Sequence, residues 1–585
     1  MILKSHLIVT IYLFKQGLGE DESIQYRKEI AICKGFIKVI LDGDEDLKNY
    51  KKKQTFDDQR VCSDYNKEVE YRFGKADHIW SNEWSLYLLE SELAIICDHF
   101  DLAKEQSTLK RISYQDILSA QVDENNKKQV VLQVYKKVKQ NEVFMICRKR
   151  QVVLRQFQKV IFTLNEEQKA FGFAARLQSR LSSVQYVLNE MPRRRRLLVL
   201  INPFSGQKMA TQNWAIAQPI LEKAYLDMNI IHTQRAMHAY EIVSSLKIGE
   251  YDGIVTVSGD GLLHEVVNAL FRHKHCEEIL ANGLTLGIIP GGTSNGLFKS
   301  LVEEAGEATT VESAAYLIAR GRRRAIDLTE IDAEYSPNQK IYSFLSVFWA
   351  VLADCDINSE VIRWMGSPRF TVWGIYRILF MKRYHGSLYF NGSKITNQND
   401  AENISQILTE SSHLQNSLLP PVTQPILSNH SNISQVTLQS YENKQFSYFF
   451  IQNSPYIGIK IHSAPMAKIN DGFNDIVVQE ANQGRFKLTN QLLQHDDGSY
   501  FNQNNGELKN SLGIDYLKCT EWRLDPFLKT PCELTFDSEG NQVDNRIYPQ
   551  NYEYDESAFF SIDGEKYPAQ RIQGRVLKGA LPIYY

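Results

Sequence analysis

Three apolar runs in the middle of the chain each end in a turn rich in glycine, asparagine or hydroxyl residues. The runs are Leu197–Ile201, Val255–Val257 and Leu284–Ile289. Short apolar runs of this kind are typical of buried strands in a parallel sheet, and a helical pattern of apolar residues follows the first turn at Ala210–Lys223 and the second at Leu262–Leu270. Because the carboxyl ends of parallel strands meet at one edge of a sheet, the pattern predicts an α/β fold whose turns lie together.

The second turn, Ser258-Gly259-Asp260-Gly261, is the most informative. Its glycines let the backbone approach a bulky ligand, and the helix that follows offers free N–H groups to an anion such as a phosphate. A carboxylate beside a polyphosphate is repelled unless it has a chemical role, so Asp260 is a candidate proton acceptor or metal ligand. A purely structural turn is the simpler explanation of this block by itself. The two neighbouring turns favour a phosphate site.

These blocks resemble the motifs of the lipid kinase superfamily that comprises sphingosine, diacylglycerol and ceramide kinases. The sphingosine kinase branch is the most similar, because the likeness continues far beyond the three turns. The matching segments are Asn202–Pro203, Ser258–Asn268, Pro290–Asn295, Phe344–Trp349, Asp354–Glu360, Arg363, Met365–Gly366, Arg369–Thr371 and Asp563–Glu565. Their order and spacing follow the family pattern over about residues 194–390 and 446–585.

The fold predicted from the pattern and the resemblance is α/β. A three-layer α/β nucleotide-binding domain of the diacylglycerol kinase type is expected over residues 194–330, and a β-rich, sandwich-like lipid-binding domain over 331–585. Short apolar segments followed by a helix at Glu166–Leu181 predict a pleckstrin-homology-like domain over 76–190, after a poorly defined extension over 1–75. A stretch rich in Asn, Gln and Ser over about 391–443 is predicted to be a disordered insertion.

The resemblance implies ATP and Mg²⁺ as cofactors and gives roles to particular residues. Asp260 is the implied general base for a primary hydroxyl, with metal or water ligation as the alternative. Arg363 and Arg369 match arginines that contact the ATP phosphates, and Glu265 is close enough on the helix to orient magnesium or nucleotide. The full set of expected nucleotide-binding residues is Asn202, Pro203, Phe204, Ser205, Gly206, Thr233, Ser258, Gly259, Gly261, Glu265, Gly291, Gly292, Thr293, Ser294, Arg363, Arg369, Asp563, Gly564 and Glu565. The sequence does not identify the metal ligands.

Asp356 decides the expected acceptor. In the sphingosine kinase pattern this position faces the amine of the sphingoid base, and a buried carboxylate is a suitable partner for an ammonium group. Ser346 matches a position that hydrogen-bonds the polar head, and Ser258–Gly261 completes the expected substrate site. Asp354 is a neighbour with which Asp356 is easily confused. Asp471-Gly472 departs from the animal sphingosine kinase pattern toward the general superfamily motif, which keeps diacylglycerol and ceramide open as substrates.

Charge and cysteine content indicate the expected partners and the cellular compartment. The chain has 66 basic and 69 acidic residues and a net charge of -3, so nothing in it indicates nucleic-acid binding. Its eight cysteines lack paired short spacing, which favours a reducing, cytoplasmic compartment with peripheral membrane association. Basic residues of the N-terminal domain (Lys110, Arg111 and Arg148–Arg150) are candidates for anionic phospholipid, although a solvated charged face is the simpler explanation. A homodimer is compatible with the sequence.

The sequence therefore predicts an ATP- and magnesium-dependent kinase that phosphorylates sphingosine or a related sphingoid base to sphingosine 1-phosphate. Diacylglycerol or ceramide kinase is the first alternative. A catalytically dead lipid-binding scaffold is the second, and it is disfavoured because Asp260, the glycines and the arginines are all present. A dinucleotide-binding enzyme is disfavoured because no G-x-G-x-x-G follows a strand with an acidic residue at the required distance.

Overall fold

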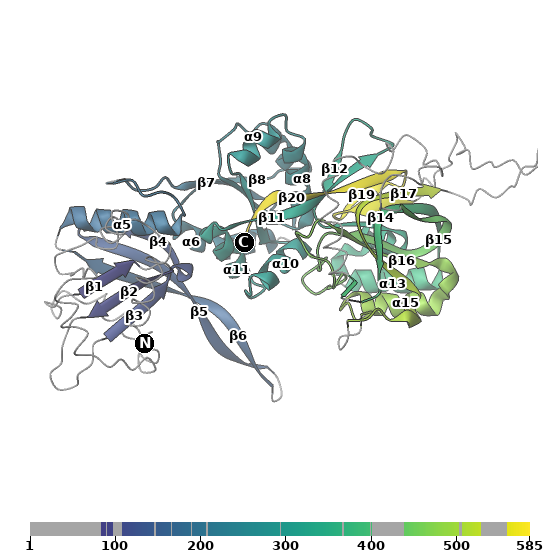
Figure 1. Cartoon of the computed structure of the whole chain (residues 1–585), viewed down its shortest axis with the longest axis horizontal. Coiled ribbons are helices and arrows are strands. Elements are labelled where there is room, and N and C mark those ends of the chain that lie inside the picture. The colour runs from purple at the N-terminus through teal and green to yellow at the C-terminus, as the bar shows by residue number, and fades with distance from the viewer. Residues whose placement is uncertain are drawn as a thin grey trace, which may run out of the picture. The chain divides into compact units, whose positions relative to one another are not determined.

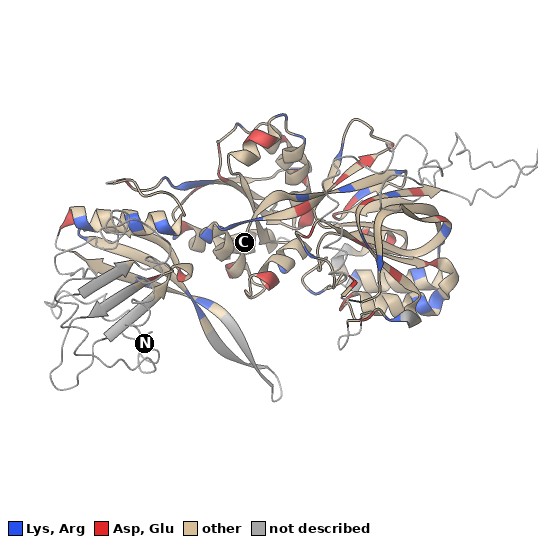
Figure 2. Ribbon diagram, in the orientation of Figure 1, with Lys and Arg blue, Asp and Glu red and all other residues tan. Residues whose placement is uncertain are grey.

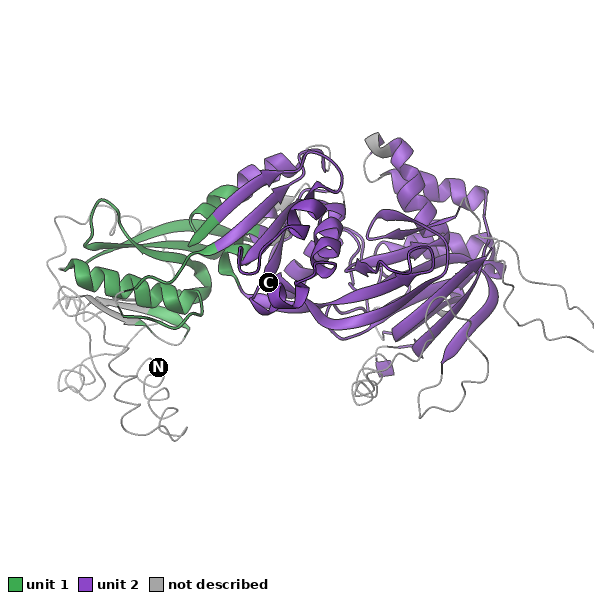
Figure 3. Cartoon of the chain, turned by 90° about the horizontal axis from the view of Figure 1, so that it is seen from above, with its two compact units in different colours: residues 1–195, 218–227, 315–321 green, residues 196–217, 228–314, 322–585 purple. Residues whose placement is uncertain are grey.

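The computed structural model describes residues 84–88, 91–97, 108–144, 148–164, 166–188, 190–205, 209–292, 294–365, 368–397, 399–400, 438–501, 506–527 and 558–585. The extension expected over 1–75 lies outside these residues. The chain forms two compact units, which are coloured separately in Figure 3. One comprises Met1–Arg195, Gln218–Asp227 and Ala315–Gly321, and the other comprises Arg196–Ala217, Met228–Ala314 and Arg322–Tyr585.

The first unit contains two antiparallel three-stranded sheets followed by a helix (Figure 1). The strands are β1 (Trp84–Leu88), β2 (Glu92–Cys97), β3 (Thr108–Ser113), β4 (Ile117–Val122), β5 (Gln129–Phe144) and β6 (Arg148–Thr163), and the helix is α5 (Glu167–Leu181). Val130, Leu132 and Val134 alternate into the core, as the two-residue period of a strand requires. The predicted terminal helix is confirmed. The pleckstrin-homology-like assignment stays a prediction, and the side chains of its candidate basic residues lie outside the described part.

The second unit begins with a parallel sheet, here called its parallel part. β7 (Arg195–Ile201) pairs with β9 (Gly253–Ser258), and β9 pairs with β10 (Thr285–Pro290), in both cases in parallel. Every residue of β9 and β10 is buried, as expected for interior strands of such a sheet. The other elements up to residue 320 are α6 (Met209–Glu222), β8 (Leu226–His232), α7 (His238–Ser244), α8 (Asp260–Phe271), α9 (Cys276–Ala281), α10 (Gly296–Glu304) and α11 (Val311–Arg320). The ends of α6 and α11 and the first two residues of β8 belong to the first unit.

The antiparallel part follows, with helices inserted between its strands. Its strands are β11 (Arg323–Ala333), β12 (Ile341–Ser343), β13 (Ser346–Trp349), β14 (Tyr384–Ile395), β15 (Gln439–Gln452), β16 (Asn474–Glu480), β17 (Ile514–Phe527), β18 (Phe559–Ile562), β19 (Glu565–Pro568) and β20 (Ile572–Tyr584). Its helices are α12 (Ala350–Ala353), the π-helical turn η4 (Asp354–Asn358), the 3-10 segment η5 (Ser359–Met365), α13 (Pro368–Leu379), η6 (Ala481–Gln483), α15 (Gly484–His495) and η7 (Asn510–Leu512).

The strands of this part are apolar on both faces. On β16, Ile476 and Val478 enter one core cluster and Val477 enters the other, which also contains Val351 of α12 and Leu488 of α15. β14 pairs with β15 and with β17, and β16 pairs with the same two strands, so these four strands form a closed ring of pairings. One face of these strands therefore packs in the first core cluster, and the other face packs in the second cluster together with α12 and α15.

Strand β20 joins the two parts of this unit into one sheet. Ile583 pairs with Leu286 of β10 in parallel, while β20 pairs in antiparallel fashion with β11 over Arg323–Ala333 and with β17 over Glu521–Leu524. The expected domain boundary at 330/331 therefore lies inside β11. Local composition gave no sign of this, because the pairing joins residues far apart in the chain.

The two ends of the expected insertion over 391–443 belong to strands, and not to a disordered segment as predicted. Residues 391–395 belong to β14 and residues 439–443 belong to β15, where they pair with neighbouring strands. Residues 401–437 lie outside the described part of the chain. Polar side chains at the strand ends produced the wrong boundaries, since half-exposed antiparallel strands carry such residues on one face.

Gly574→Ala tests the junction formed by β20. A Cβ at this position would lie 2.2 Å from Cζ2 of the buried Trp522 ring, so we expect overpacking to lower the free energy of unfolding by about 1–3 kcal/mol. Gly374→Ala in α13 is the control, because its Cβ would meet only Cys355 Sγ at 4.0 Å and alanine favours a helix. Urea denaturation of both variants measures the difference. Equal stability of Gly574→Ala and wild type would contradict this view of the junction.

Candidate active site

The first turn, after β7, is tied to the second. Phe204 N–H donates to Asn202 Oδ1 at 3.0 Å, which closes a local turn around Pro203. Ser205 Oγ then accepts a hydrogen bond from the Gly259 N–H at 3.0 Å. Thr233, at the end of β8, is buried and its N–H donates to the Ile201 carbonyl at 2.8 Å. These expected residues do lie at one edge of the sheet.

The second and third turns touch through their glycines. A Cβ on Gly292 would lie 2.3 Å from Gly259 Cα, and a Cβ on Gly291 would lie 2.9 Å from Ala210 Cα. The Gly291 N–H also donates to the Ser258 carbonyl at 2.8 Å. Only glycine fits these contacts, so the turns meet as the sequence predicted. Gly206 and Thr293 lie outside the described residues.

Asp260 begins α8 and faces the third turn. Its Oδ2 accepts a hydrogen bond from the Asn295 N–H at 2.9 Å, and its side chain keeps partial access to solvent. Burial raises the pKa of Asp260 to about 7; the bond from Asn295 lowers it, and the carboxylates of Asp563 and Asp356 raise it further. A carboxyl group with a pKa near neutrality is suited to take a proton from a hydroxyl at physiological pH.

The α8 helix begins with uncapped amides at this edge. Its N-cap, Gly259, has no side chain to satisfy them. Five residues along the helix, Glu265 has a buried Oε2 without a hydrogen-bond partner. Free N–H groups suit phosphate oxygens, and an unpaired carboxylate oxygen suits a cation. Among the described residues, no group of three or more His, Cys, Asp and Glu side chains converges in a way that would hold a metal ion.

Asp563 has a different environment from the one expected. It is buried, with φ of 52°, and its carboxylate accepts hydrogen bonds from Ser343 Oγ at 2.7 Å and from the backbone N–H groups of residues 344, 345 and 346 at 3.2, 3.0 and 3.0 Å. Its Oδ2 also lies 2.9 Å from His264 Nδ1. These bonds occupy the lone pairs of the carboxylate, so Asp563 links α8 to the residues around the start of β13. Its expected contact with the nucleotide or its magnesium stays a prediction.

Glu565, two residues later, does reach the second turn. A Cβ on Gly261 would lie 2.6 Å from Glu565 Oε1, so the carboxylate lies directly against this turn. The preceding Gly564 has φ of 89°, a conformation that favours glycine. The residue is exposed overall, but desolvation of its carboxyl raises its pKa, and the nearby Glu265, Asp356 and Asp563 carboxylates contribute to the increase. Glu265 and Glu565 are the acidic pair best placed to meet a cation.

Asp356 lies in η4, within electrostatic range of Asp260. Its Oδ2 accepts a hydrogen bond from Ser561 Oγ, and burial raises its pKa against that bond and the charge of Arg369. Ser346 starts β13 and is buried; its N–H donates to the Asp563 carboxylate at 3.0 Å, and its carbonyl accepts from the Asp563 N–H at 2.8 Å. The site therefore contains a desolvated carboxylate close to the candidate base.

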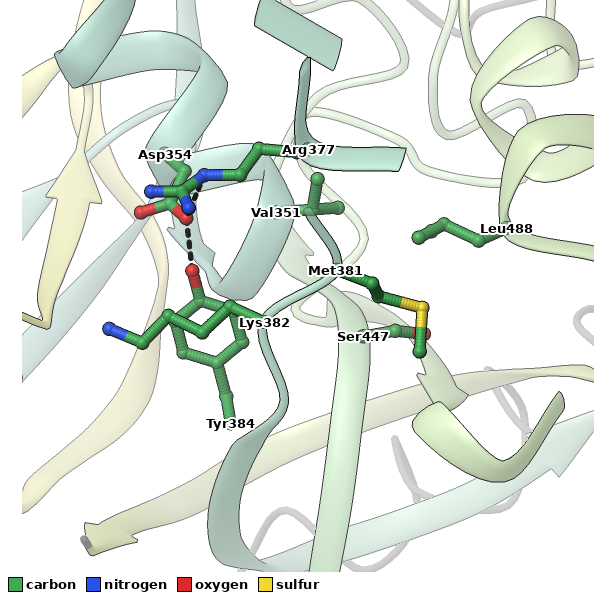
Figure 4. Close-up of a pocket in the computed structure, with 8 residues that line it drawn as sticks. All are labelled: Val351, Asp354, Arg377, Met381, Lys382, Tyr384, Ser447 and Leu488. Atoms are coloured by element: carbon green, nitrogen blue, oxygen red, sulfur yellow. Dashed lines mark hydrogen bonds and ion pairs between the residues drawn. The ribbon is translucent and has the colours of Figure 1, made fainter. Parts of the chain in front are cut away.

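Asp354 is distinguished from Asp356 by its partners. Figure 4 shows Asp354 bound by Arg377, whose Nε lies 2.8 Å from its Oδ2, and by the hydroxyl of Tyr384. The adjoining depression has no interior space that a water molecule could fill, so it is not a ligand cavity. Asp354 is thus neutralised within the protein and is not the partner of a ligand.

Arg369 is close to Asp356 and is only 7% exposed. Its Nη1 forms an ion pair with Glu360, and its guanidinium lies 4.6 Å from the Phe370 ring centroid. Its Nε is buried without a partner, which leaves a donor for a further acceptor. Arg363 lies in η5, and its side chain is outside the described part. Contact of either arginine with a phosphate stays a prediction.

The Asp471-Gly472 departure has a packing explanation. Asp471 forms an ion pair with the buried Lys518 at 2.9 Å, and the Gly472 N–H donates to Asp327 Oδ2 at 2.6 Å. Gly472 has φ of 89°, a conformation that favours glycine. These contacts hold the loop against β17 and β11, which explains the two residues by packing without reference to the lipid substrate.

Sequence reasoning gave no role to Asn295, His264 or Asn268, although all three lie in the matched blocks. His264 Nε2 lies 2.8 Å from the Tyr567 hydroxyl, and Asn268 Nδ2 donates to the Tyr342 carbonyl at 3.0 Å. For His264 and Asn268, the available signal was their spacing of four residues on the buried face of α8. Their partners are hundreds of positions away or on another element, so the sequence did not reveal them.

Comparison with known proteins agrees with this geometry. Residues 196–331 match the family described as the diacylglycerol kinase catalytic domain. The fold and site thus define a lipid kinase that uses ATP. Sphingosine kinase 1 of Arabidopsis thaliana is 32% identical over 380 residues, covering 64% of this chain and 74% of that protein. Sphingoid long chain base kinase 4 of Schizosaccharomyces pombe is 29% identical over 389 residues, covering 66% and 73%. The chain belongs to the sphingosine kinase family.

One solved structure gives a weaker comparison. A diacylglycerol kinase from Bacillus anthracis str. Sterne has a TM-score of 0.40 and 16% identity, covering 67% of this chain and 98% of that one. The superposition is too loose to support an argument about the site. The family assignment rests on the sequence relatives.

Asp260→Asn tests the candidate base in two ways. Turnover should fall at least about a hundredfold, because a positioned base contributes that much. Because the folded pKa of about 7 is above the ordinary value of ~3.9, ionising Asp260 destabilises the fold as pH rises from about 4 through 7. The melting temperature of Asp260→Asn relative to wild type should therefore be higher at pH 8 than at pH 5. Undiminished turnover would remove Asp260 from the chemistry.

Proposed function

We propose that the protein transfers the γ-phosphate of ATP to the primary hydroxyl of sphingosine or a related sphingoid base, giving sphingosine 1-phosphate. The observation that carries the proposal is Asp356, a carboxylate whose charge is disfavoured by burial and which lies within electrostatic range of Asp260. An ammonium group of the lipid would offset the desolvation of this carboxylate. Diacylglycerol and ceramide have no such cation.

The reaction follows from the residues at the sheet edge. The lipid hydroxyl loses its proton to Asp260 as its oxygen forms a bond to the γ-phosphorus. The bond from that phosphorus to the bridging oxygen breaks, and ADP leaves with the electron pair. The amides at the start of α8 and in the glycine turns are suited to hold the phosphate oxygens, and Arg369 supplies a buried cation nearby.

Mg²⁺ fits the same acidic residues. Glu265 has a buried carboxylate oxygen without a partner, and Glu565 lies against the second turn, so these two side chains would hold the ion together with phosphate oxygens. When bound, the ion would neutralise charge on the transferring phosphate. Asp563 does not join this set, because its lone pairs are used within the protein.

Diacylglycerol or ceramide kinase activity is the alternative within the same fold. The sequence feature that favoured it, Asp471-Gly472, is accounted for by Lys518 and Asp327. A dead scaffold is a poor description of a chain in which Asp260, the touching glycines and Arg369 are retained at one edge. The acceptor is therefore tested through Asp356.

Asp356→Asn should weaken the use of sphingosine by about 2–4 kcal/mol, which is about 30- to 900-fold in kcat/KM, while KM for ATP stays similar. The physical reason is that the variant leaves a buried ammonium group without a counter-charge. Any turnover of diacylglycerol should change little, because that lipid is neutral. A labelled-ATP assay in mixed micelles measures both acceptors.

Asp354→Asn is the matched control for this experiment. It removes a neighbouring carboxylate that is already paired with Arg377 and Tyr384, so it should reduce stability without changing the preference between the two lipids. Equal losses on charged and neutral acceptors with Asp356→Asn, or no loss on sphingosine, would contradict the sphingoid assignment.

We also propose that the protein collects its lipid from an anionic membrane surface through α13, α15 and the segments beside them, here called the docking face. Among the described residues, no helix is long and apolar enough to span a membrane. α13 and α15 pack against each other and carry exposed apolar side chains. These are Val361, Val372, Ile375, Leu379, Phe380, Phe486 and Leu493. Phe486 and Leu493 are 79% and 73% exposed, which is unusual for large apolar groups.

Basic residues accompany this apolar surface. Arg485 and Lys487 lie on α15, whose ribbon carries blue segments in Figure 2. Lys382 and Arg383 follow α13. A combination of exposed apolar side chains and cations suits an interface with anionic lipid headgroups. The apolar run Phe370–Met381 thus supplies outward-facing side chains.

Replacing Leu379 and Phe380 together by serine should reduce binding to phosphatidylcholine–phosphatidylserine vesicles about tenfold or more, since each side chain loses apolar area that would be buried in the bilayer. Sedimentation with vesicles measures this. Ile248→Ser is the control and should bind like wild type, because it makes the same kind of apolar-to-serine change at a residue that is 50% exposed outside the docking face. Unchanged vesicle binding of the double variant would exclude the docking face.

A further inference from the structure

Asn295 stands at the centre of the three turns. It is 1% exposed and caps the N-terminus of α10 with φ of 52° and ψ of 52°. This left-handed conformation is unfavourable for most side chains and is adopted by asparagine more readily than by others. A residue held in this conformation in the interior is fixed by its surroundings.

Three hydrogen bonds fix it. Its backbone N–H donates to Asp260 Oδ2 at 2.9 Å, its Nδ2 donates to the Ser258 carbonyl at 2.9 Å, and its Oδ1 accepts from the Gly292 N–H at 2.9 Å. One residue thus binds the candidate base, the end of β9 and the third turn. The backbone N–H and Nδ2 thus both reach the second turn, while Oδ1 holds the third turn through Gly292.

The turn that carries Asn295 has little freedom to move. The Ile459 N–H donates to the Ser294 carbonyl at 2.9 Å, and a Cβ on Gly296 would lie only 2.5 Å from the carbonyl carbon of Ile457. The loop after β15 therefore packs directly on this turn. The orientation of the Asn295 N–H is set by both the side-chain bonds and this contact.

We propose that Asn295 is a positioning residue for phosphoryl transfer: through its N–H it orients the Asp260 carboxylate, and through its side chain it keeps that carboxylate in line with the glycine turns. The proposal rests on Asp260 being the base, but it does not depend on which lipid is the acceptor. The N–H also opposes the carboxylates that face Asp260, which are Asp356 and Asp563, with Glu565 beside Gly261. Loss of alignment at a reacting group is costly even when it is small.

Asn295→Gly tests the side chain separately from the backbone. Glycine keeps the left-handed conformation and the N–H but loses the bonds to Ser258 and Gly292. With whichever lipid the wild type phosphorylates best, kcat should fall about tenfold to a hundredfold, while KM for ATP and for lipid changes less than about twofold. Unchanged kcat would overturn the proposal. Because the assay uses the preferred acceptor, a wrong assignment of the lipid would not produce that result.

Asn295→Asp tests the effect on Asp260. The new carboxylate stands beside the base, so the acid limb of the kcat–pH profile should move to higher pH. Asn268→Asp is the matched control: this buried asparagine binds the His264 ring and carbonyl and the Tyr342 carbonyl and N–H, and lies about 12 Å from Asp260 along α8. Both variants should lose thermal stability, but only Asn295→Asp should shift the acid limb. An acid limb that is the same in both variants would show that Asn295 has a structural role alone.

Discussion

The Asp563 carboxylate is the constraint on which the site depends. It accepts hydrogen bonds from Ser343 and from the backbone of the next three residues, and it pairs with His264 on the helix that begins at Asp260. One buried group thus links α8 to the start of β13. Strand β20 makes a second connection between the parallel and antiparallel parts of the unit, by pairing with β10 and with β11. The distance between the base and the acceptor segment is fixed by these two connections.

The second governing feature is an excess of negative charge. Asp260, Asp356 and Glu565 each have a raised pKa because burial and neighbouring carboxylates disfavour ionisation. An arrangement of this kind is unfavourable for stability by itself, and it becomes favourable when cations bind. Magnesium beside the phosphates, and an ammonium group on the lipid, are cations that the proposed reaction would bring. Stability and function are therefore in opposition at this edge, as is common at catalytic sites.

The sequence predicted the parts of the site that are local. Each apolar strand ends in its own turn, and parallel pairing alone brings Ser205, Gly259 and Gly291 together. It named Asp563 but did not predict the structural role of that carboxylate, because its donors in residues 343–346 lie about two hundred positions earlier. The boundary inside β11 was missed for the same reason, since its partner is the C-terminal strand. The exposed face of α13 was missed because an apolar run does not reveal which of its sides is covered.

In the proposed reaction the acceptor is recognised by its positive charge. The decisive comparison uses sphingosine and N-acetylsphingosine as acceptors for the wild-type protein in the same micelles, because the two share the hydroxyl and differ at the amine. We expect kcat/KM for sphingosine to be higher by about 30-fold or more, the scale of a buried charge pair. Equal kcat/KM for the two lipids would contradict recognition by charge and indicate a lipid kinase that does not distinguish an amine from an amide.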